Sequence, residues 1–192
     1  LNIGLFNEIF KFCEKANINF NEVIELASTK WNFIKYKPGL VGGHCLPVDP
    51  YYLSHISKKY NLKMEILLAG RKVNDQMESY IYKKIINELK KNRLSLKSKL
   101  LIFGESYKPN VGDQRNSIAQ KIILKILKIN KKIKVFDPTI DNKFFYKKYR
   151  IDKINVKDRF HAIIQLVNHD DGKREIQKYL KFNKRTVFIK LF

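Results

Sequence analysis

The sequence is poor in cysteine, tryptophan and acidic residues. Its 192 residues include 2 cysteines and 1 tryptophan, and 18 Asp and Glu stand against 39 Lys and Arg. Two cysteines without a CxxC pair exclude a disulfide framework and a zinc ribbon. The chain also lacks an apolar run of about 18 residues, and its first residues lack the basic region and cleavage site of a signal peptide. We therefore expect a cytoplasmic protein without a membrane partner.

The formal net charge of +21 raises the question of a nucleic-acid partner. The lysines are scattered among Ile, Asn, Phe and Tyr, and no RNP, zinc-finger or helix-turn-helix signature accompanies them. This distribution favours lysines on solvated faces, so we expect no nucleic-acid partner. A nucleic-acid function and an attraction for anionic small molecules remain the alternatives, and a basic field would favour a phosphorylated substrate.

The first half of the sequence has the apolar spacing of helices. This spacing predicts helices that run up to Ala16 and over residues 19–27, 51–59 and 64–91. We expect the long loop 29–50 to be functional and the helix after it to begin at Pro50. The last helix is long enough to span two domains or to form a dimer seam, and an ordinary core helix is the alternative.

The second half alternates strands with helices. Short apolar runs predict strands at 100–103, KIKVFDP, AIIQLV and TVFIKLF, with helices near 117–129, 141–148 and 171–180 between them. This order predicts an α/β fold with a parallel sheet and right-handed crossovers. The polar loop from Gly104 to Ser117 would lie at the carboxyl ends of the strands, where such sheets bind ligands. No GxGxxG follows the first strand, so this half lacks the dinucleotide fingerprint.

The segment KPGLVGGHCLPVDPYYL, residues 37–53, has the composition of a ligand site. Its adjacent Gly42 and Gly43 allow a positive φ and a close approach of the backbone to a ligand, although a plain turn would also use them. Cys45 follows just before an expected helix start, and a helix N-terminus favours the thiolate of a cysteine. We expect Cys45 to be a covalent catalyst.

Two alternatives for Cys45 remain open. It could be a structural thiol, or it could bind a metal together with His44, Asp49 and His55, although adjacent His and Cys do not match a common zinc spacing. We expect no metal. Cys13 lies on the apolar face of a helix, so we expect it to be buried. The histidines, His161 and His169 included, are expected to be incidental to catalysis.

These residues carry a family resemblance. PGLVGGHCLPVDPYYL resembles the active-site loop of the UDP-glucose/GDP-mannose dehydrogenase family, and most closely its branch that oxidises UDP-N-acetylhexosamines. NIGLFNE, STKWNF, GRKVNDQM and FGESYKPNVGDQRNS resemble further motifs of that family, in the same order along the chain. Beyond residue 117 the similarity is one of strand and helix pattern.

The resemblance implies a domain plan. Family members are similar in having an N-terminal NAD-binding domain, a central helical domain that forms a homodimer and a C-terminal Rossmann-like domain that binds the UDP-sugar. We therefore expect residues 1–95 to be the central domain, with the active-site loop 37–53 and the long connecting helix. Residues 96–192 would be the UDP-sugar-binding domain. The NAD-binding domain is missing from this chain, so we expect no turnover by the chain alone.

The resemblance also implies roles for individual residues. Cys45 matches the family's nucleophile, which carries the sugar as a thioester, and Asp49 matches the aspartate that organises water and protons. Lys108 matches a lysine beside the sugar; a surface lysine is the alternative. Gly42 and Gly43 would let backbone amides approach the sugar.

The resemblance assigns roles to two further basic residues. Arg115 matches an arginine that contacts the NAD of the N-terminal domain, and an ion pair with Asp113 is the alternative. Lys37 lies where this branch often has a basic residue near the sugar nucleotide. The implied activity is oxidation of the C6 alcohol of a UDP-N-acetylhexosamine to the uronate, for surface polysaccharide synthesis. A non-catalytic sugar-nucleotide-binding or dimerisation module is the alternative.

Overall fold

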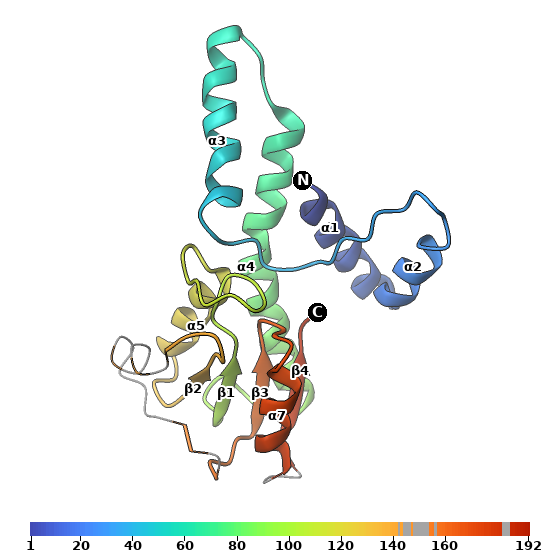
Figure 1. The fold of residues 1–192 in the computed structure, drawn as a ribbon. Helices are drawn as coiled ribbons and strands as arrows, with labels where there is room; N and C mark the ends of the chain where they lie inside the picture. The colour runs from blue at the N-terminus through green and yellow to red at the C-terminus, as the bar shows by residue number, and fades with distance from the viewer. Residues whose placement is uncertain (142, 144–146, 148–153, 156, 182–184) are drawn as a thin grey trace. The chain divides into compact units, whose positions relative to one another are not determined.

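The structure is a computed structural model that describes residues 1–192 except 142, 144–146, 148–153, 156 and 182–184 (Figure 1). Its contacts divide the chain into two compact units. The first unit contains residues 1–41, 45–77 and 192, and the second contains residues 42–44 and 78–191. The short segment 42–44 therefore belongs with the C-terminal residues, although its neighbours along the chain belong with the N-terminal ones.

The first unit is helical. It contains α1 (Asn2–Ala16), α2 (Phe20–Ala27), α3 (Cys45–Ser57), the 3-10 turn η1 (Lys58–Tyr60) and the first part of α4 (Glu65–Lys91). α1 buries Phe6, Phe10 and Cys13 on one face at the helical period. α2 begins after Asn19, whose side chain accepts a hydrogen bond from the Asn21 N–H. Both helices were predicted from the sequence, and both are confirmed.

The helix α3 begins earlier than the sequence predicts. The sequence places a loop up to Pro50 and a helix from Tyr51, but the helix begins at Cys45 and has Pro50 in its interior. Proline has no N–H, so it leaves the carbonyl oxygen of Leu46 without its usual helical donor. The Nη1 atom of the buried Arg71 lies 3.5 Å from that oxygen. This donor from another helix replaces the missing bond. The sequence around Pro50 does not indicate such a distant donor.

The helix α4 is the long helix that the sequence predicts up to Lys91. It has 27 residues, and its fully buried side chains recur at the helical period: Met77, Ile81, Ile85 and Leu89. The boundary between the two units along the sequence lies inside this helix, because Met77 belongs to the first unit and Glu78 to the second. The helix therefore connects the units, as its length suggests. The domain limits 1–95 and 96–192 stay a prediction.

The second unit contains a parallel sheet. Its strands are β1 (Leu100–Phe103), β2 (Lys134–Phe136), β3 (Ala162–Gln165) and β4 (Val187–Lys190). They lie in the order β2, β1, β3, β4, and each neighbouring pair is parallel. Ile102 of β1 pairs with Val135 of β2 and Ile164 of β3. The predicted α/β fold, a helical part followed by a Rossmann-like parallel sheet, is confirmed.

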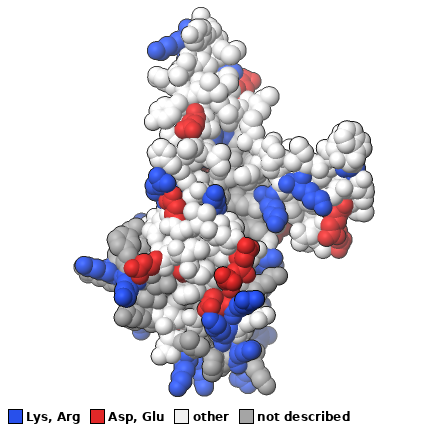
Figure 2. Space-filling view, in the orientation of Figure 1, with Lys and Arg blue, Asp and Glu red and all other residues white. Residues whose placement is uncertain are grey.

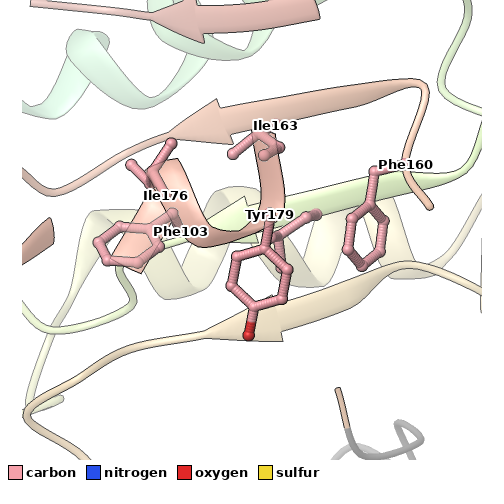
Figure 3. Packing of buried hydrophobic residues seen from close by; sticks show 6 residues of the cluster. Phe103, Phe160, Ile163, Ile176 and Tyr179 are labelled. Atoms are coloured by element: carbon pink, nitrogen blue, oxygen red, sulfur yellow. The ribbon is translucent and has the colours of Figure 1, made fainter. Parts of the chain in front are cut away.

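Helices flank the strands of this sheet along the chain. α5 (Ile118–Leu127) begins after Ser117, whose hydroxyl accepts from the Gln120 N–H, and α7 (Gly172–Lys181) follows β3. Ile176 and Tyr179 of α7 pack on the sheet. They form a buried cluster with Phe103, Phe160 and Ile163 (Figure 3). The predicted helices in both places are confirmed. Most of the helix predicted at 141–148 falls outside the described residues.

Charged side chains of both signs lie on one face of the molecule. Figure 2 shows Lys and Arg side chains interspersed with Asp and Glu side chains over the face that it displays. This is the distribution expected of lysines at solvated positions. In the part of the chain that the structure describes, no helix combines the length and the apolar character that crossing a membrane requires.

Candidate functional site

The segment Gly42–His44, here called the strap, is bound to the loop Gly104–Ser117, here called the β1 loop. The N–H of Gly43 donates to the carbonyl oxygen of Arg115 at 3.0 Å. The carbonyl oxygen of Gly43 accepts from Nδ2 of Asn116 at 3.1 Å. Two consecutive residues of the β1 loop thus satisfy both polar backbone groups of Gly43. The strap and the β1 loop belong to the same unit, so this contact is part of the second unit itself.

Neither glycine of the strap has room for a side chain. A Cβ on Gly42 would lie 2.8 Å from the carbonyl oxygen of Asn116 and 2.8 Å from the Cβ of Tyr107. A Cβ on Gly43 would lie 2.9 Å from the Tyr107 ring, and the φ of 92° at Gly43 is one that glycine adopts without strain. Packing against the β1 loop therefore explains both glycines. Their contact with a sugar stays a prediction.

Cys45 and Asp49, the predicted catalytic residues, lie at the start of α3 in the first unit. Both are exposed, and their spacing of four residues places them on the same face of the helix. Cys13, by contrast, is 2% exposed, and its predicted burial is confirmed. Lys37 is exposed in the segment before the strap. A thiol and a carboxylate arranged in this way can supply a nucleophile and a proton acceptor, which stay predicted roles.

A polar group in the first unit holds the start of α3 on α4. The Tyr51 hydroxyl donates to Oδ2 of Asp75 at 2.9 Å, and Nη2 of Arg71 donates to Oδ1 of the same carboxylate. The Arg71 side chain also reaches the carbonyl oxygen of Leu46. Because Leu46 follows Cys45 directly, these contacts fix the turn of α3 that carries the thiol.

Two of the sequence motifs meet in the first unit. Asn7, in NIGLFNE, donates from Nδ2 to Oδ1 of Asn74, in GRKVNDQM, at 3.0 Å. The same Asn7 side chain bonds both backbone groups of Gly39, donating to its carbonyl oxygen at 3.0 Å and accepting from its N–H at 2.9 Å. Asn7 and Asn74 are buried. These contacts fix the chain two residues after Lys37.

Asp137, which follows β2, holds the start of the β1 loop. Its Oδ2 accepts from the N–H of Glu105 at 2.8 Å and from the N–H of Ser106 at 2.9 Å. Its Oδ1 accepts from the N–H and the hydroxyl of Thr139. Burial alone would raise the pKa of Asp137, but the hydrogen bonds from His169, Thr139 and the two backbone groups outweigh it and hold the pKa well below its ordinary value. The carboxylate is therefore charged at neutral pH.

His169, which follows β3, belongs to the same buried cluster. Its Nδ1 accepts from the N–H of Asn110 at 3.0 Å, and its Nε2 lies 3.2 Å from Oδ2 of Asp137 and 3.3 Å from Oγ of Ser106. A backbone N–H can only donate, so Nδ1 carries no proton, and a neutral ring donates from Nε2 to Asp137. The three side chains do not have the arrangement of a catalytic triad. In a triad the serine and the aspartate contact opposite nitrogens of the histidine, whereas Ser106 and Asp137 both contact Nε2 of His169. The cluster therefore holds the loop on both sides of Lys108.

Lys108 and Arg115 are exposed on the β1 loop. The backbone at Lys108 is fixed by the Ser106 hydroxyl, which donates to its carbonyl oxygen at 3.1 Å, and Nζ lies 5.6 Å from the Tyr107 ring centroid. Arg115 donates from Nε and Nη2 to Oδ2 of Asp113 at 2.9 and 2.7 Å. These bonds, together with the Arg115 N–H, hold the pKa of Asp113 below its ordinary value. The ion pair is thus formed, and a contact of Arg115 with NAD stays a prediction.

The turn after β1 does not fit the pyrophosphate of NAD. In dinucleotide-binding domains, the N–H groups of this turn bind the phosphates. Here the N–H groups of Glu105 and Ser106 are bonded to the Asp137 carboxylate. Val167 closes the turn from the other side, because a Cβ on Gly104 would lie 2.5 Å from its Cβ. These N–H groups are thus already bonded within the protein, in agreement with the missing GxGxxG.

Metal binding was one alternative for Cys45. No group of three or more His, Cys, Asp or Glu side chains among the described residues is placed to hold a metal ion. The alternative with His44, Asp49 and His55 therefore has no support in the described part of the chain. The exposure of Cys45 also disfavours a structural thiol, because structural cysteines are among the most buried residues.

The structure brings the predicted residues together within each unit. In the second unit, Gly43 bonds the backbone of Arg115 and lies against Tyr107, next to Lys108 in the chain. In the first unit, Cys45 shares α3 with Asp49. The joint action of residues from the two units stays a prediction.

Four residues of the β1 loop and its surroundings were missed by sequence reasoning: Tyr107, Asn116, Asp137 and His169. The first two lie inside the motif FGESYKPNVGDQRNS, which gave a signal for the loop but not for these side chains. Asp137 follows a strand at the edge where ligands bind, which is a usable signal. His169 is not incidental to the structure, because it is 2% exposed and hydrogen-bonded.

Comparison with known proteins identifies the family. The model of the UDP-glucose/GDP-mannose dehydrogenase family central domain matches residues 1–76, and the model of its UDP binding domain matches residues 101–191. The chain is 37% identical over 177 residues to the UDP-N-acetyl-D-glucosamine 6-dehydrogenase of Salmonella typhi, and this match covers 91% of the chain. The chain belongs to the UDP-glucose/GDP-mannose dehydrogenase family.

Further members of the UDP-glucose/GDP-mannose dehydrogenase family are similar over nearly all of the chain. The UDP-N-acetyl-D-mannosamine dehydrogenase of Methanococcus maripaludis is 35% identical over 174 residues, 88% of this chain. The solved structure of the UDP-N-acetyl-mannosamine dehydrogenase of Staphylococcus aureus superposes with a TM-score of 0.70 at 27% identity, over 99% of this chain. The chain spans 42% of the Salmonella protein, 38% of the Methanococcus protein and 42% of the Staphylococcus chain.

Proposed function

We propose that the chain is part of an NAD-dependent nucleotide-sugar 6-dehydrogenase that oxidises a UDP-N-acetylhexosamine to its uronate. One observation carries the proposal. An exposed cysteine, Cys45, begins a helix inside the region that matches the family's central domain, in a chain similar to UDP-N-acetylglucosamine and UDP-N-acetylmannosamine dehydrogenases. The match to the family's UDP binding domain supports a UDP-sugar as the ligand of the second unit.

The proposed chemistry takes place at one carbon. NAD, which accepts hydride when it is bound, would be held mainly by residues outside this chain, with Arg115 as a contact. Once the C6 alcohol has become an aldehyde, the sulfur of Cys45 adds to its carbon and the carbonyl oxygen takes a proton, which gives a thiohemiacetal. A second NAD would be needed as acceptor for the hydride that the thiohemiacetal loses, and loss of the hydroxyl proton as well would leave a thioester on Cys45. Water then attacks the thioester carbon, the C–S bond breaks, and the carboxylate leaves.

The surrounding residues have proposed roles in binding and proton transfer. Asp49, one turn after the thiol on α3, would take the proton of the attacking water. Lys108 would place a positive charge beside the sugar and stabilise a negative oxygen. Lys37 and the backbone of Gly42 and Gly43 would contact the sugar nucleotide. The clusters around Asp137 and Arg71 support these assignments, because they fix the backbone on which Lys108 and Cys45 lie.

We further propose that the enzyme acts as a homodimer in the cytoplasm, in surface polysaccharide synthesis. The exposed apolar side chains of the first unit support a protein partner there: they include Leu5, Phe12, Trp31 and Ile66. The same activity would make the charged uronate that polysaccharide synthesis consumes.

A calorimetric titration tests the substrate class. The ligands are UDP-N-acetylglucosamine, UDP and a random DNA duplex, each at low and at physiological salt. We expect both uridine ligands to bind at both salt concentrations. Lys108→Ala should weaken the binding of the UDP-sugar by about tenfold, because it removes one charge-assisted contact. Lys131→Ala, which removes an exposed lysine outside the β1 loop, should leave the affinity unchanged.

The other outcomes separate the alternatives. If the UDP ligands do not bind and the duplex binds only at low salt, the proposal is wrong and the net positive charge is what attracts the ligand. If the UDP-sugar binds but the enzyme with its NAD-binding domain forms no uronate, the chain is a non-catalytic binding module. If Cys45→Ser forms uronate as fast as the native enzyme, Cys45 is not the nucleophile.

A further inference from the structure

The strap is held by two side chains of the β1 loop, Tyr107 and Asn116. The Tyr107 ring lies against Gly43, and the Cβ of Tyr107 leaves no space for a side chain on Gly42. Asn116 donates from Nδ2 to the Gly43 carbonyl oxygen at 3.1 Å. One side chain thus fixes the strap by packing and the other by a hydrogen bond.

The backbone beneath these two side chains is itself fixed. The Tyr107 N–H donates to the carbonyl oxygen of Asp113 at 2.9 Å, which closes the β1 loop. Asn116 precedes Ser117, the N-cap of α5, whose hydroxyl donates to the carbonyl oxygen of Glu105 at 2.6 Å. The strap is therefore bonded to a loop that is tied at both ends to the sheet and to α5.

Asn116 has a conformation that few residues adopt. Its φ is 51°, in the left-handed region, where asparagine is several-fold enriched over other non-glycine residues. In this conformation the side chain bonds the strap, while the Arg115 carbonyl oxygen next to it accepts from the Gly43 N–H. A purely local role in the turn would need only the left-handed backbone. The bond to the strap is an additional feature that the turn does not require.

We propose that Asn116 and Tyr107 are positioning residues for the Cys45 thiol. The inference rests on the proposed function, in which Cys45 is the nucleophile. Cys45 is the second residue after Gly43, so the two side chains restrict the backbone that leads into the thiol. Covalent catalysis depends on such restriction, since a displacement of about 1 Å can cost about a hundredfold in rate. Neither residue touches the substrate in this account; both act through the strap.

The test measures position directly and needs neither substrate nor cofactor. A nitroxide label is attached to the exposed Cys45 of the folded chain, while the buried Cys13 is left unlabelled. Electron paramagnetic resonance then reports the mobility of the label, and hydrogen exchange reports the protection of the Gly43 N–H. Because no ligand is present, failure of this inference is distinguishable from failure of the proposed function, which the titration with UDP ligands tests.

Four variants separate positioning from a local role in the turn. Asn116→Gly keeps the left-handed backbone and removes the bond to the strap, and Asn116→Asp removes the donor. In both we expect a more mobile label and exchange at Gly43 that is about fivefold faster, the equivalent of one ordinary hydrogen bond. Tyr107→Ala should have the same effect, and Tyr107→Phe, which keeps the ring, should have none.

A matched control defines the contradicting result. Asn61→Gly removes an asparagine that has a φ of 56° at a site outside the strap, so neither readout should change. If Asn116→Gly leaves both the label mobility and the Gly43 exchange at the level of this control, Asn116 serves only the turn and the inference is wrong. If one of the variants fails to fold, the two substitutions at Asn116 and the pair at Tyr107 still give independent answers.

Discussion

The two units bury their apolar side chains to different degrees. In the second unit, β1 and β3 are buried along their whole length, and among its described residues the exposed large apolar side chains are Leu124, Ile129 and Phe188. The first unit has many more, including Phe12, Trp31, Tyr60 and Ile66. The second unit thus completes a core of its own, whereas the first leaves apolar surface of the kind that protein partners cover.

This difference has a counterpart in the candidate site. The second unit carries the β1 loop, whose N–H groups donate to Asp137 and His169, and the strap, which is bonded to Arg115 and Asn116 of that loop. The first unit carries Cys45 on a helix whose exposed apolar side chains indicate further contacts. The buried sheet and the hydrogen-bonded β1 loop thus both lie in the second unit. Stability and binding should therefore depend on the second unit.

The largest expected effect comes from truncating the core of the second unit. Phe103→Ala removes a fully buried ring that packs against Phe136, and it should lower the free energy of unfolding by about 3–5 kcal/mol. Phe12→Ala removes the same ring at a position that is 64% exposed in the first unit, and it should change the free energy by less than about 0.5 kcal/mol. Urea denaturation measures both. Equal losses would show that the units do not differ in this way.

The next effect comes from the carboxylate that holds the β1 loop. Asp137→Asn keeps the size of the side chain, but its amide NH2 group would face N–H and O–H donors that now bond to carboxylate oxygens. The substitution should lower the free energy of unfolding by about 3 kcal/mol. Asp141→Asn, at an exposed position a few residues on, should have little effect. If Asp137→Asn is as stable as the control, the carboxylate does not hold the loop.

The same carboxylate predicts a dependence on pH. The folded pKa of Asp137 lies below its unfolded value of about 3.9, so folding favours the charged form and the unfolded state binds the proton first. The contribution is complete above about pH 4 and is lost as the pH falls below it. The stability difference between the native chain and Asp137→Asn should therefore shrink in acid. A difference that stays constant down to about pH 2.5 would contradict the assignment.

A smaller effect is expected in the strap. Gly42→Ala places a methyl group against the Asn116 carbonyl oxygen and the Cβ of Tyr107, and it should destabilise the second unit by about 1–3 kcal/mol and weaken UDP-sugar binding. Gly39→Ala is the matched control, because a Cβ on Gly39 meets nothing within 4 Å. Thermal denaturation and calorimetry measure the two effects. Tolerance of both substitutions would mean that the strap moves away from the β1 loop.

The sequence predicts most of the secondary structure because the apolar spacing is regular. Strand β1 is a continuous apolar run and helix α4 has a long regular stripe, so the limits predicted for both agree with the structure. Asn19 and Ser117 mark the starts of α2 and α5, because each caps its helix with a side-chain hydrogen bond. The start of α3 is not predictable in this way. Pro50 suggests a helix start, but Arg71, distant in sequence, replaces the bond that proline removes. Tertiary contacts of this kind leave no local pattern.

The candidate site was predictable only where a residue type carries the chemistry. Cys45 is proposed from the sequence because a thiol suggests a nucleophile, Lys108 because it matches a family motif, and Gly42 and Gly43 because adjacent glycines allow a close approach of the backbone to a ligand. The supporting residues are different. Asp137 and His169 act by accepting and donating hydrogen bonds inside the folded loop, and this depends on which strand ends meet in the sheet.

The proposed function requires that Cys45 lies in the site of a UDP-sugar. The most direct measurement is the rate at which iodoacetamide alkylates Cys45, with and without saturating UDP-N-acetylglucosamine, with the buried Cys13 as an internal reference in the same mass spectrum. We expect the ligand to slow the alkylation of Cys45 and Cys13 to stay unmodified. An unchanged rate at Cys45 under conditions where calorimetry shows the ligand bound would contradict it.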